Sequence, residues 1–172
     1  MNKEEIEKTI KKYGDDWYYY YNFDGVEIKP SLKNDPTSGF NNWKKLKPIM
    51  EDLFSKFDAP CVFNIGCNMA LYDHEMFKMG AKTIGIDRQN EIEQALFYKK
   101  YIIENIKEKW GSELIPGEID NYNIIRPEVN IITLFCVMYH FTISPDIIFD
   151  KFLTIFPNHK YIVIQGNIPR VK

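Results

Sequence analysis

The spacing of hydrophobic and polar positions changes near residue 60. Before that point the clearest signal is an apolar stripe over 42–57, which recurs at three- and four-residue steps and predicts one buried face of a helix. Asp58-Ala59-Pro60 ends this helix. Residues 3–12 predict a shorter amphipathic helix, and Asp24-Gly25 predicts a hairpin turn inside 17–30. The stripe consists of Trp43, Leu46, Ile49, Met50, Leu53, Phe54 and Phe57.

Beyond residue 60, short apolar runs alternate with helical patterns. The runs predict buried strands, with a weaker one near 114–119. In the longest helix, Ile92, Ala95, Leu96, Ile102, Ile103 and Ile106 are expected to face inward. The strong strands are CVFNI (61–65), TIGID (83–87), NIITLFCVM (130–138) and YIVIQ (161–165), and the helices span about 69–79, 90–109 and 145–156.

Strands that alternate with helices at this spacing predict parallel pairing through right-handed crossovers. We therefore expect a doubly wound, mainly parallel, Rossmann-like α/β sheet. Residues 1–41 would form an N-terminal extension, built from a helix and an aromatic hairpin or loop, and 42–172 would form the core. In such folds, ligands bind at the carboxyl ends of the strands.

Composition narrows the class of protein further. A length of 172 residues suits one domain, and a net charge of -2 gives no sign of nucleic-acid binding. Cys61, Cys67 and Cys136 are odd in number and lack the spacing of metal ligands, so we expect neither disulfides nor a metal site. The charged N-terminus excludes a secretory signal, and no apolar run approaches the ~18 residues of a membrane helix. A cytoplasmic protein is expected.

The loop after the first core strand is the strongest candidate for chemistry. Asn64–Ala70 leaves a buried strand and enters a helix; Gly66 permits a close backbone approach, and the helix N-terminus suits a carboxylate. About 20 residues later, Asp87 ends the second strand, where an acid can accept hydrogen bonds from ribose. The glycines of a dinucleotide loop and the GK[ST] of a P-loop are absent. The layout indicates another adenosine cofactor.

Two stretches resemble class I S-adenosylmethionine-dependent methyltransferases. NIGCNMALYDHEMFKMGAKTIGIDRQNEIEQA is similar to their first two motifs, the first of which is usually written D-I-G-C-N-x-G. VNIITLFCVMYHF is similar to their fourth motif. The resemblance covers roughly 17–167 and is closest to the group related to tRNA wobble-uridine carboxymethyl-transferring enzymes. It implies strand order 3-2-1-4-5, S-adenosylmethionine as cofactor and S-adenosylhomocysteine as product.

The resemblance also implies roles for single residues. Asn64 and the backbone of Gly66, Cys67 and Asn68 would face the methionine end of the cofactor. Asp87, followed by Arg88, would bind the ribose, and Glu118 or Asp120 would approach the adenine. Phe135–Tyr139 would line the methyl-transfer site. His140, with Tyr139, is the catalytic candidate; a histidine titrates near neutral pH and suits a general base, although a structural role is the alternative.

Three positions depart from the methyltransferase pattern. Asn64 and Asn130 stand where aspartates are usual, and Ala70 stands where the last glycine is usual. Exchanging a charged hydrogen bond for a neutral one at Asn64 would weaken cofactor binding roughly tenfold. A catalytically inactive, methyltransferase-like binding or regulatory subunit is therefore the second hypothesis. A different nucleotide-binding domain, such as a reductase, is the third, and the missing glycines argue against it.

The C-terminal end of the pattern bears on partners. Seven residues follow Gln165, too few for the helix and antiparallel strand pair that usually complete this fold. YIVIQ (161–165) would then be an exposed edge, open to pairing with a homodimer partner or another protein. A chain cut at a domain boundary and a minimal natural variant are the alternatives. The methyl acceptor is not identified; the resemblance favours RNA or a small molecule.

The aromatic run Trp17–Tyr21 has two interpretations. Its rings could stack on bases or cover the cofactor pocket. Alternatively, they form an aromatic face that packs on the sheet, which is the interpretation we favour.

Overall fold

The computed structural model describes residues 1–14, 17, 20–28, 38–135 and 144–166. It contains helices α1 Lys3–Tyr13, α2 Ser38–Phe54, α3 Leu71–Lys78, α4 Gln89–Tyr101 and α5 Pro145–Ile155, with a π-helical turn η1 at Ile102–Ile106 and a 3₁₀ turn η2 at Ile119–Asn121. The strands are β1 Tyr21–Phe23, β2 Val26–Ile28, β3 Cys61–Ile65, β4 Lys82–Asp87, β5 Glu113–Pro116, β6 Ile131–Phe135 and β7 Tyr161–Gln165.

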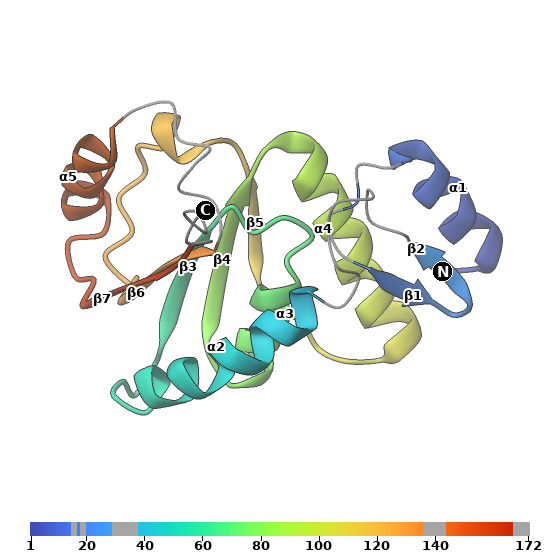
Figure 1. The fold of residues 1–172 in the computed structure, drawn as a ribbon, viewed down its shortest axis with the longest axis horizontal. Coiled ribbons are helices and arrows are strands. Elements are labelled where there is room, and N and C mark those ends of the chain that lie inside the picture. The colour runs from blue at the N-terminus through green and yellow to red at the C-terminus, as the bar shows by residue number, and fades with distance from the viewer. Residues whose placement is uncertain (15–16, 18–19, 29–37, 136–143, 167–172) are drawn as a thin grey trace, which may run out of the picture.

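Five strands form one parallel sheet in the order β5-β4-β3-β6-β7 (Figure 1). Counted from β3, this order is 3-2-1-4-5, so the predicted α/β fold and topology are confirmed. β3 and β7 have the predicted bounds, and β4 begins one residue earlier than predicted. Among the described strands, β7 pairs with β6 alone and forms one edge of the sheet.

The inward face of the longest helix was predicted correctly for Ile92, Ala95 and Ile102 but wrongly for three other residues. Leu96, Ile103 and Ile106 are exposed, whereas Tyr98 and Tyr101 are buried. The helix changes to π-helical winding at Ile102, which rotates the residues after it relative to an α-helical stripe. The N-terminal elements also bury a side of α4 that would be exposed to solvent without them. In α2, Ile49 is likewise exposed although it belongs to the predicted stripe.

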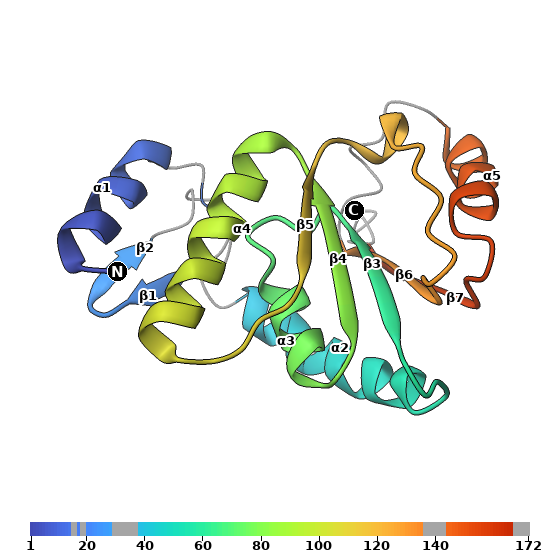
Figure 2. The ribbon, with the colours of Figure 1, turned by 180° about the vertical axis from the view of Figure 1, so that it is seen from behind.

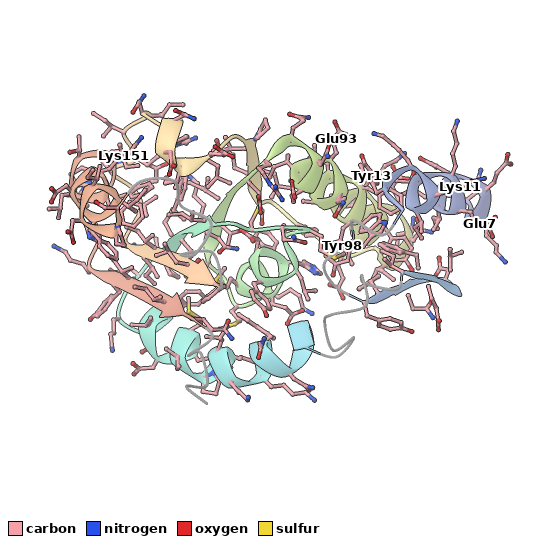
Figure 3. The ribbon with its side chains drawn as sticks, turned by 45° about the horizontal axis from the view of Figure 1, so that its top comes forward. Glu7, Lys11, Tyr13, Glu93, Tyr98 and Lys151 are labelled. Carbon is pink, nitrogen blue, oxygen red and sulfur yellow. The ribbon has the colours of Figure 1, made fainter. Side chains whose placement is uncertain are left out.

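The N-terminal extension packs against α4 and not against the sheet (Figure 2). Trp17 lies 6.1 Å from Phe97 between ring centroids, and Phe23 lies 4.7 Å from Tyr101. Tyr13 donates a 2.7 Å hydrogen bond to Glu93, between α1 and α4 (Figure 3). The expected packing of the aromatic run on the sheet is therefore wrong for Trp17. Its indole ring instead contacts α1, the hairpin and α4. The predicted division between 1–41 and 42–172 stays a prediction.

The sheet buries two different faces. Side chains on one face pack with α2, α3, α4 and the N-terminal elements, and those on the other pack with α5 and the segment after β5. Alternation along each strand assigns neighbouring residues to opposite faces. None of the helices in the described ranges is long and apolar enough to cross a membrane.

Candidate functional site

The loop between β3 and α3 has an unusual backbone. Gly66, Asn68 and Ala70 have φ values of 72°, 51° and 58°, so positive values alternate along the loop. The amides of Gly66 and Cys67 both donate to the carbonyl of Ile86, at 2.9 and 3.2 Å, and anchor the loop to β4. Ala70 holds a conformation that costs a residue with a Cβ about 1–2 kcal/mol. The motif's usual glycine at this position is thereby explained by backbone conformation.

Asp87 closes the loop from the end of β4. Its Oδ2 accepts a 2.7 Å hydrogen bond from the amide of Asn68, and its Oδ1 accepts one of 2.8 Å from the amide of Arg88. Burial raises the pKa of this carboxyl, and the two amides oppose that shift. Each carboxylate oxygen has more than one lone pair, so Asp87 keeps acceptor capacity for ribose hydroxyls. The Arg88 side chain is exposed and pairs with Glu91.

The predicted adenine-contacting residues lie at the neighbouring strand end. β5 pairs with β4 so that Pro116 is opposite Asp87, and the amide of Gly117 donates to the Asp87 carbonyl at 2.8 Å. Glu118 follows at once and is exposed. Asp120 lies in η2, where its carbonyl accepts a hydrogen bond from Lys151 of α5. The fold therefore brings Glu118 to the same edge of the sheet as Asp87.

Asn64 belongs to a row of buried, hydrogen-bonded polar side chains that runs from β6 through β3 to α3. Thr133 of β6 donates to Asn64 Oδ1 at 2.9 Å, and Asn64 Nδ2 donates to Asp73 Oδ2 of α3 at 2.6 Å. All three side chains are buried. The amide of Asn64 is thus satisfied inside the protein, and its expected contact with a cofactor stays a prediction.

Asp73 is a buried acid that was not among the site residues predicted from the sequence. Its side chain is fully buried, and burial raises the pKa of the carboxyl from 3.8 to about 7. The local pattern does not reveal its burial, because LYDHEM (71–76) has polar residues at three successive positions, Asp73, His74 and Glu75. Five residues of this helix are buried, Asp73 among them.

Cys67 is sealed against β4. A Cβ atom added to Gly85 would lie 2.8 Å from Cys67 Sγ and 3.0 Å from Asp73 Oδ1, so a glycine is needed for this close approach. Burial raises the pKa of the Cys67 thiol well above its usual value. A thiol that stays protonated is a poor nucleophile. The position of Cys67 fits packing of the loop.

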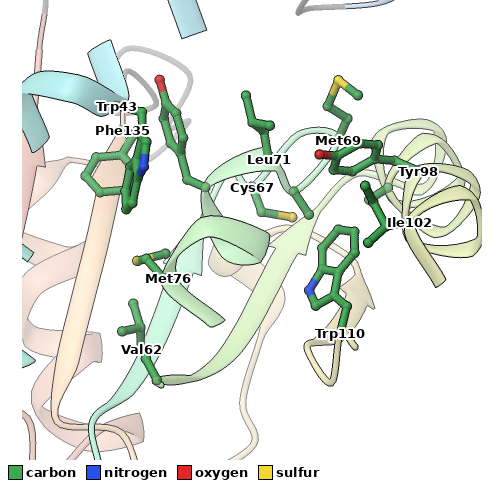
Figure 4. Close-up of a cluster of buried hydrophobic side chains, with 14 of the residues drawn as sticks. Trp43, Val62, Cys67, Met69, Leu71, Met76, Tyr98, Ile102, Trp110 and Phe135 are labelled. Atoms are coloured by element: carbon green, nitrogen blue, oxygen red, sulfur yellow. The ribbon is translucent and has the colours of Figure 1, made fainter. Parts of the chain in front are cut away.

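Aromatic rings gather at the carboxyl end of β6 (Figure 4). Phe135 meets Tyr72 of α3 edge to face, at 5.3 Å between ring centroids. Tyr72 in turn stacks on Trp43 of α2 at 5.5 Å. Phe135 and Trp43 are buried, so these rings form a wall beside the loop of β3. The catalytic candidates Tyr139 and His140 lie outside the described residues.

Comparisons with known proteins point to one fold. No protein-family profile and no curated protein sequence matches the chain. Among solved structures, WbdD matches with a TM-score of 0.66 and 15% identity over 96% of this chain and 37% of its own. The N-terminal domain of EvdMO1, crystallised with S-adenosylhomocysteine and D-fucose, matches with a TM-score of 0.56 and 15% identity over 81% and 55%.

A third match is the plantazolicin methyltransferase BpumL, in complex with a triazolic desmethyl analogue and S-adenosylhomocysteine. It has a TM-score of 0.54 and 17% identity, over 92% of this chain and 53% of its own. The chain therefore spans between 37% and 55% of the length of these three structures. At such identities the similarity concerns the fold. The chain has the Rossmann-like fold that S-adenosylmethionine-dependent methyltransferases share.

Proposed function

We propose that the protein binds S-adenosylmethionine at the β3–α3 loop and transfers the cofactor's methyl group to an acceptor. The observation that carries this proposal is the loop 66–70, with its three positive φ values, braced by Asp87. The loop lies where the chain order of the sheet reverses, because β4 and β6 flank β3 on opposite sides. Open α/β sheets bind ligands at such switch points.

The residues present suit this cofactor. Amides at the start of α3 can bind the methionine carboxylate, since a helix N-terminus favours an anion. Asp87 can accept hydrogen bonds from the ribose diol, and we assign the contact with adenine to Glu118. The rings of Phe135, Tyr72 and Trp43 border the same strand ends and can exclude water from the reacting atoms. Solved structures of this fold that contain S-adenosylhomocysteine support the same cofactor.

Methyl transfer from this cofactor requires positioning of the reactants more than a catalytic side chain. The bound cofactor supplies a methyl group on a positively charged sulfur, which an acceptor lone pair displaces in line. The chain then has to hold the two reactants in register and keep water out. No dedicated acid or base need lie among the described residues. An acceptor that carries a proton would lose it to solvent or to His140.

We propose a small-molecule acceptor. Two similar structures support this choice, because one was crystallised with D-fucose and the other, a plantazolicin methyltransferase, with a triazolic desmethyl analogue. A net charge of -2 offers little attraction for a polyanion. The resemblance to enzymes related to tRNA wobble-uridine modification makes RNA the competing acceptor, and the transfer assay below separates the two.

The departures in the loop support a second candidate, an inactive cofactor-binding or regulatory subunit. Asn64 is committed to Thr133 and Asp73, and Ala70 adds a methyl group in a left-handed conformation. Such a subunit would keep the cofactor loop without the transfer step. The edge strand β7 would pair with a partner chain in this case.

Calorimetric titration with S-adenosylmethionine and with S-adenosylhomocysteine tests cofactor binding. We expect micromolar affinity in the wild type and at least a tenfold loss in Asp87→Ala, because the variant removes both the ribose acceptor and the acceptor for the Asn68 amide. Asp52→Asn, on the exposed side of α2, is the control that should not change affinity. Absence of binding at millimolar ligand would overturn the proposal.

Transfer is tested separately. The protein is incubated with methyl-labelled S-adenosylmethionine and fractions of small metabolites, RNA and protein. Label in the small-molecule fraction is the expected result, whereas label in RNA would contradict the proposed acceptor. Tight cofactor binding without label in any fraction would favour the inactive subunit.

A further inference from the structure

A buried carboxyl group lies directly behind the β3–α3 loop. Asp73 projects from α3 with no exposed surface. Its Oδ2 accepts from Asn64 at 2.6 Å, and its Oδ1 has no hydrogen-bond partner among the described residues. The same Oδ1 lies against Gly85 of β4, as does the sulfur of Cys67. Asp73 is therefore hydrogen-bonded to the strand that precedes the loop and lies against the strand that anchors the loop, at the same glycine as Cys67 of the loop.

The groups that face Asp73 are neutral or acidic. β3 contributes the amide of Asn64, and β4 contributes Gly85 together with the hydroxyl of Thr83, which donates to the Asp73 carbonyl. The loop contributes the thiol of Cys67, and Asp87 at the end of β4 adds a second negative charge nearby. No lysine or arginine pairs with Asp73 among the described residues. An ionised carboxylate here lacks compensation from a cation.

Asp73 provides an acid beside the position where the methyltransferase motif usually has one. The first methyltransferase motif usually ends its strand with an acid, and this chain has Asn64 there. Asp73 of α3 accepts a hydrogen bond from this amide, so a carboxyl group lies next to Asn64 although the strand itself carries no acid.

We propose that Asp73 is a positioning residue of the cofactor loop and that it gives up its proton when a cationic ligand binds there. The inference rests on the proposed function and extends it to the electrostatics of the same site. Without ligand, the neutral carboxylic acid avoids an uncompensated buried charge. A nearby cation favours the ionised form, and the ionised form in turn favours the cation. Asp73 also holds the amide of Asn64 in one orientation, between Thr133 and itself.

The two cofactor forms should differ in this respect. S-adenosylmethionine carries a positive sulfonium as well as an ammonium, whereas S-adenosylhomocysteine has a neutral sulfur. The substrate form should therefore displace more proton from Asp73 than the product form. Since burial raises the pKa of this carboxyl to about 7, the exchange falls within the neutral range. A loop that prefers the charged form would bind the substrate and release the product.

The test is calorimetry at pH 7 in phosphate and in Tris, two buffers whose ionisation enthalpies differ. We expect release of up to about half a proton per S-adenosylmethionine bound, because a group with a pKa near 7 is half protonated at that pH. Less should be released with S-adenosylhomocysteine. Asp73→Asn, which keeps the shape and can still accept from Asn64, should show no such release. Glu75→Gln, on the same helix, removes an equal charge and should behave like the wild type.

A charge swap separates electrostatics from packing. In Asn64→Asp with Asp73→Asn, the acid returns to β3 while the buried hydrogen bond can be retained. The swap should recover S-adenosylmethionine affinity that Asp73→Asn alone loses. Failure of the swap to recover affinity in a folded protein, or equal proton release in wild type and Asp73→Asn, would overturn the role of Asp73.

The ligand-free protein gives a readout that does not depend on cofactor binding. The folded-state pKa of Asp73 exceeds its ordinary value of 3.8, so the stabilisation from this group is present at low pH and is lost as pH rises from about 4 to about 7. The wild type should therefore lose melting temperature over this range relative to Asp73→Asn. If this difference appears but no cofactor binds, the proposed function and the coupling both fail, while the buried titration stands. If cofactor binds but the difference is absent, only the inference fails.

Discussion

The two faces of the central sheet are built from the same strands but from different chemistry. On the three central strands, the face toward α5 buries only apolar side chains, which are Cys61, Phe63, Ile65, Ile84, Ile86, Ile132 and Leu134. The face toward α2, α3 and α4 also buries Asn64, Thr83 and Thr133, with Gly85 among them. Since neighbouring residues of a strand alternate between faces, one strand takes part in both.

This contrast separates stability from function. Buried polar groups cost free energy unless they are hydrogen-bonded, so a fold that needed only stability would use the apolar solution on both faces. Here the polar groups gather on the face that leads to the candidate loop, and they connect to it through Asp73. We infer that the α5 face mainly holds the sheet together. The α3 face sets the conformation and charge of the site.

The largest expected effect lies on the apolar face. Phe152 of α5 is fully buried and packs on Phe156 at 5.9 Å between ring centroids. Phe152→Ala should reduce the free energy of unfolding by about 3–5 kcal/mol, the cost of a large core cavity. Urea denaturation measures this loss. Phe152→Leu is a milder variant that should stay folded at working temperature.

The contrast between faces makes a specific claim about Phe152→Leu. Its affinity for S-adenosylmethionine should equal that of the wild type, because the change lies on the far side of the sheet from the loop. A change in affinity as large as that of Asp73→Asn would mean that the two faces are not separable.

A smaller loss of stability is expected where the polar face is most tightly packed. Gly85→Ala would introduce a Cβ atom 2.8 Å from Cys67 Sγ and 2.9 Å from its Cβ. Such overpacking costs about 1–3 kcal/mol, and the strain would fall on the loop and on Asp73. We therefore expect a loss in unfolding free energy together with weaker cofactor binding. Chemical denaturation and calorimetry on the same sample measure both.

Gly166→Ala is the matched control. Apart from its chain neighbours, no described residue has an atom within 4 Å of a Cβ placed at Gly166, and this glycine directly follows β7. Its stability should stay within about 0.5 kcal/mol of the wild type, as for other surface substitutions. Equal destabilisation by both variants would show that loss of a glycine, and not contact with Cys67 and Asp73, causes the effect.

The sequence predicted the backbone elements around the site better than the side-chain contacts within it. The positions of the strong strands and the loop at Asn64–Ala70 follow from local apolar runs and from Gly66. The order of the sheet was expected from the resemblance to methyltransferases. The left-handed conformation of Ala70 is visible only through the comparison with the glycine that usually stands there. Asp73 could not be placed, because its role depends on Asn64 and Gly85, which belong to other elements.

The helix faces show the same limit. The exposed sides of Leu96 and Ile103 depend on the π-helical turn and on the N-terminal extension, neither of which a periodicity of 3.6 residues contains. The hydrophobic pattern of α4 is nearly uniform around the helix, so packing by distant segments decides which side is buried. Long-range packing overrides the pattern wherever both sides of a helix are apolar.

The smallest effect is expected at Ala70, where two opposing terms nearly cancel. Ala70→Gly removes a fully buried methyl group, a loss of about 0.8 kcal/mol. The same change removes the cost of a left-handed conformation and so stabilises the fold by about 1–2 kcal/mol. The greater freedom of glycine in the unfolded chain destabilises the fold by about 0.5–1 kcal/mol. Unfolding free energy should therefore stay within about 1 kcal/mol of the wild type.

Ala95 provides the comparison that isolates the backbone term. It is as fully buried as Ala70 but lies inside α4, so Ala95→Gly loses both the methyl group and helix propensity, about 2 kcal/mol together. A clear gap between the two variants in urea denaturation would show that the loop, unlike the helix, stores backbone strain. Equal losses would mean that the backbone at Ala70 is not strained. Backbone strain would then not explain the glycine that is usual at this position.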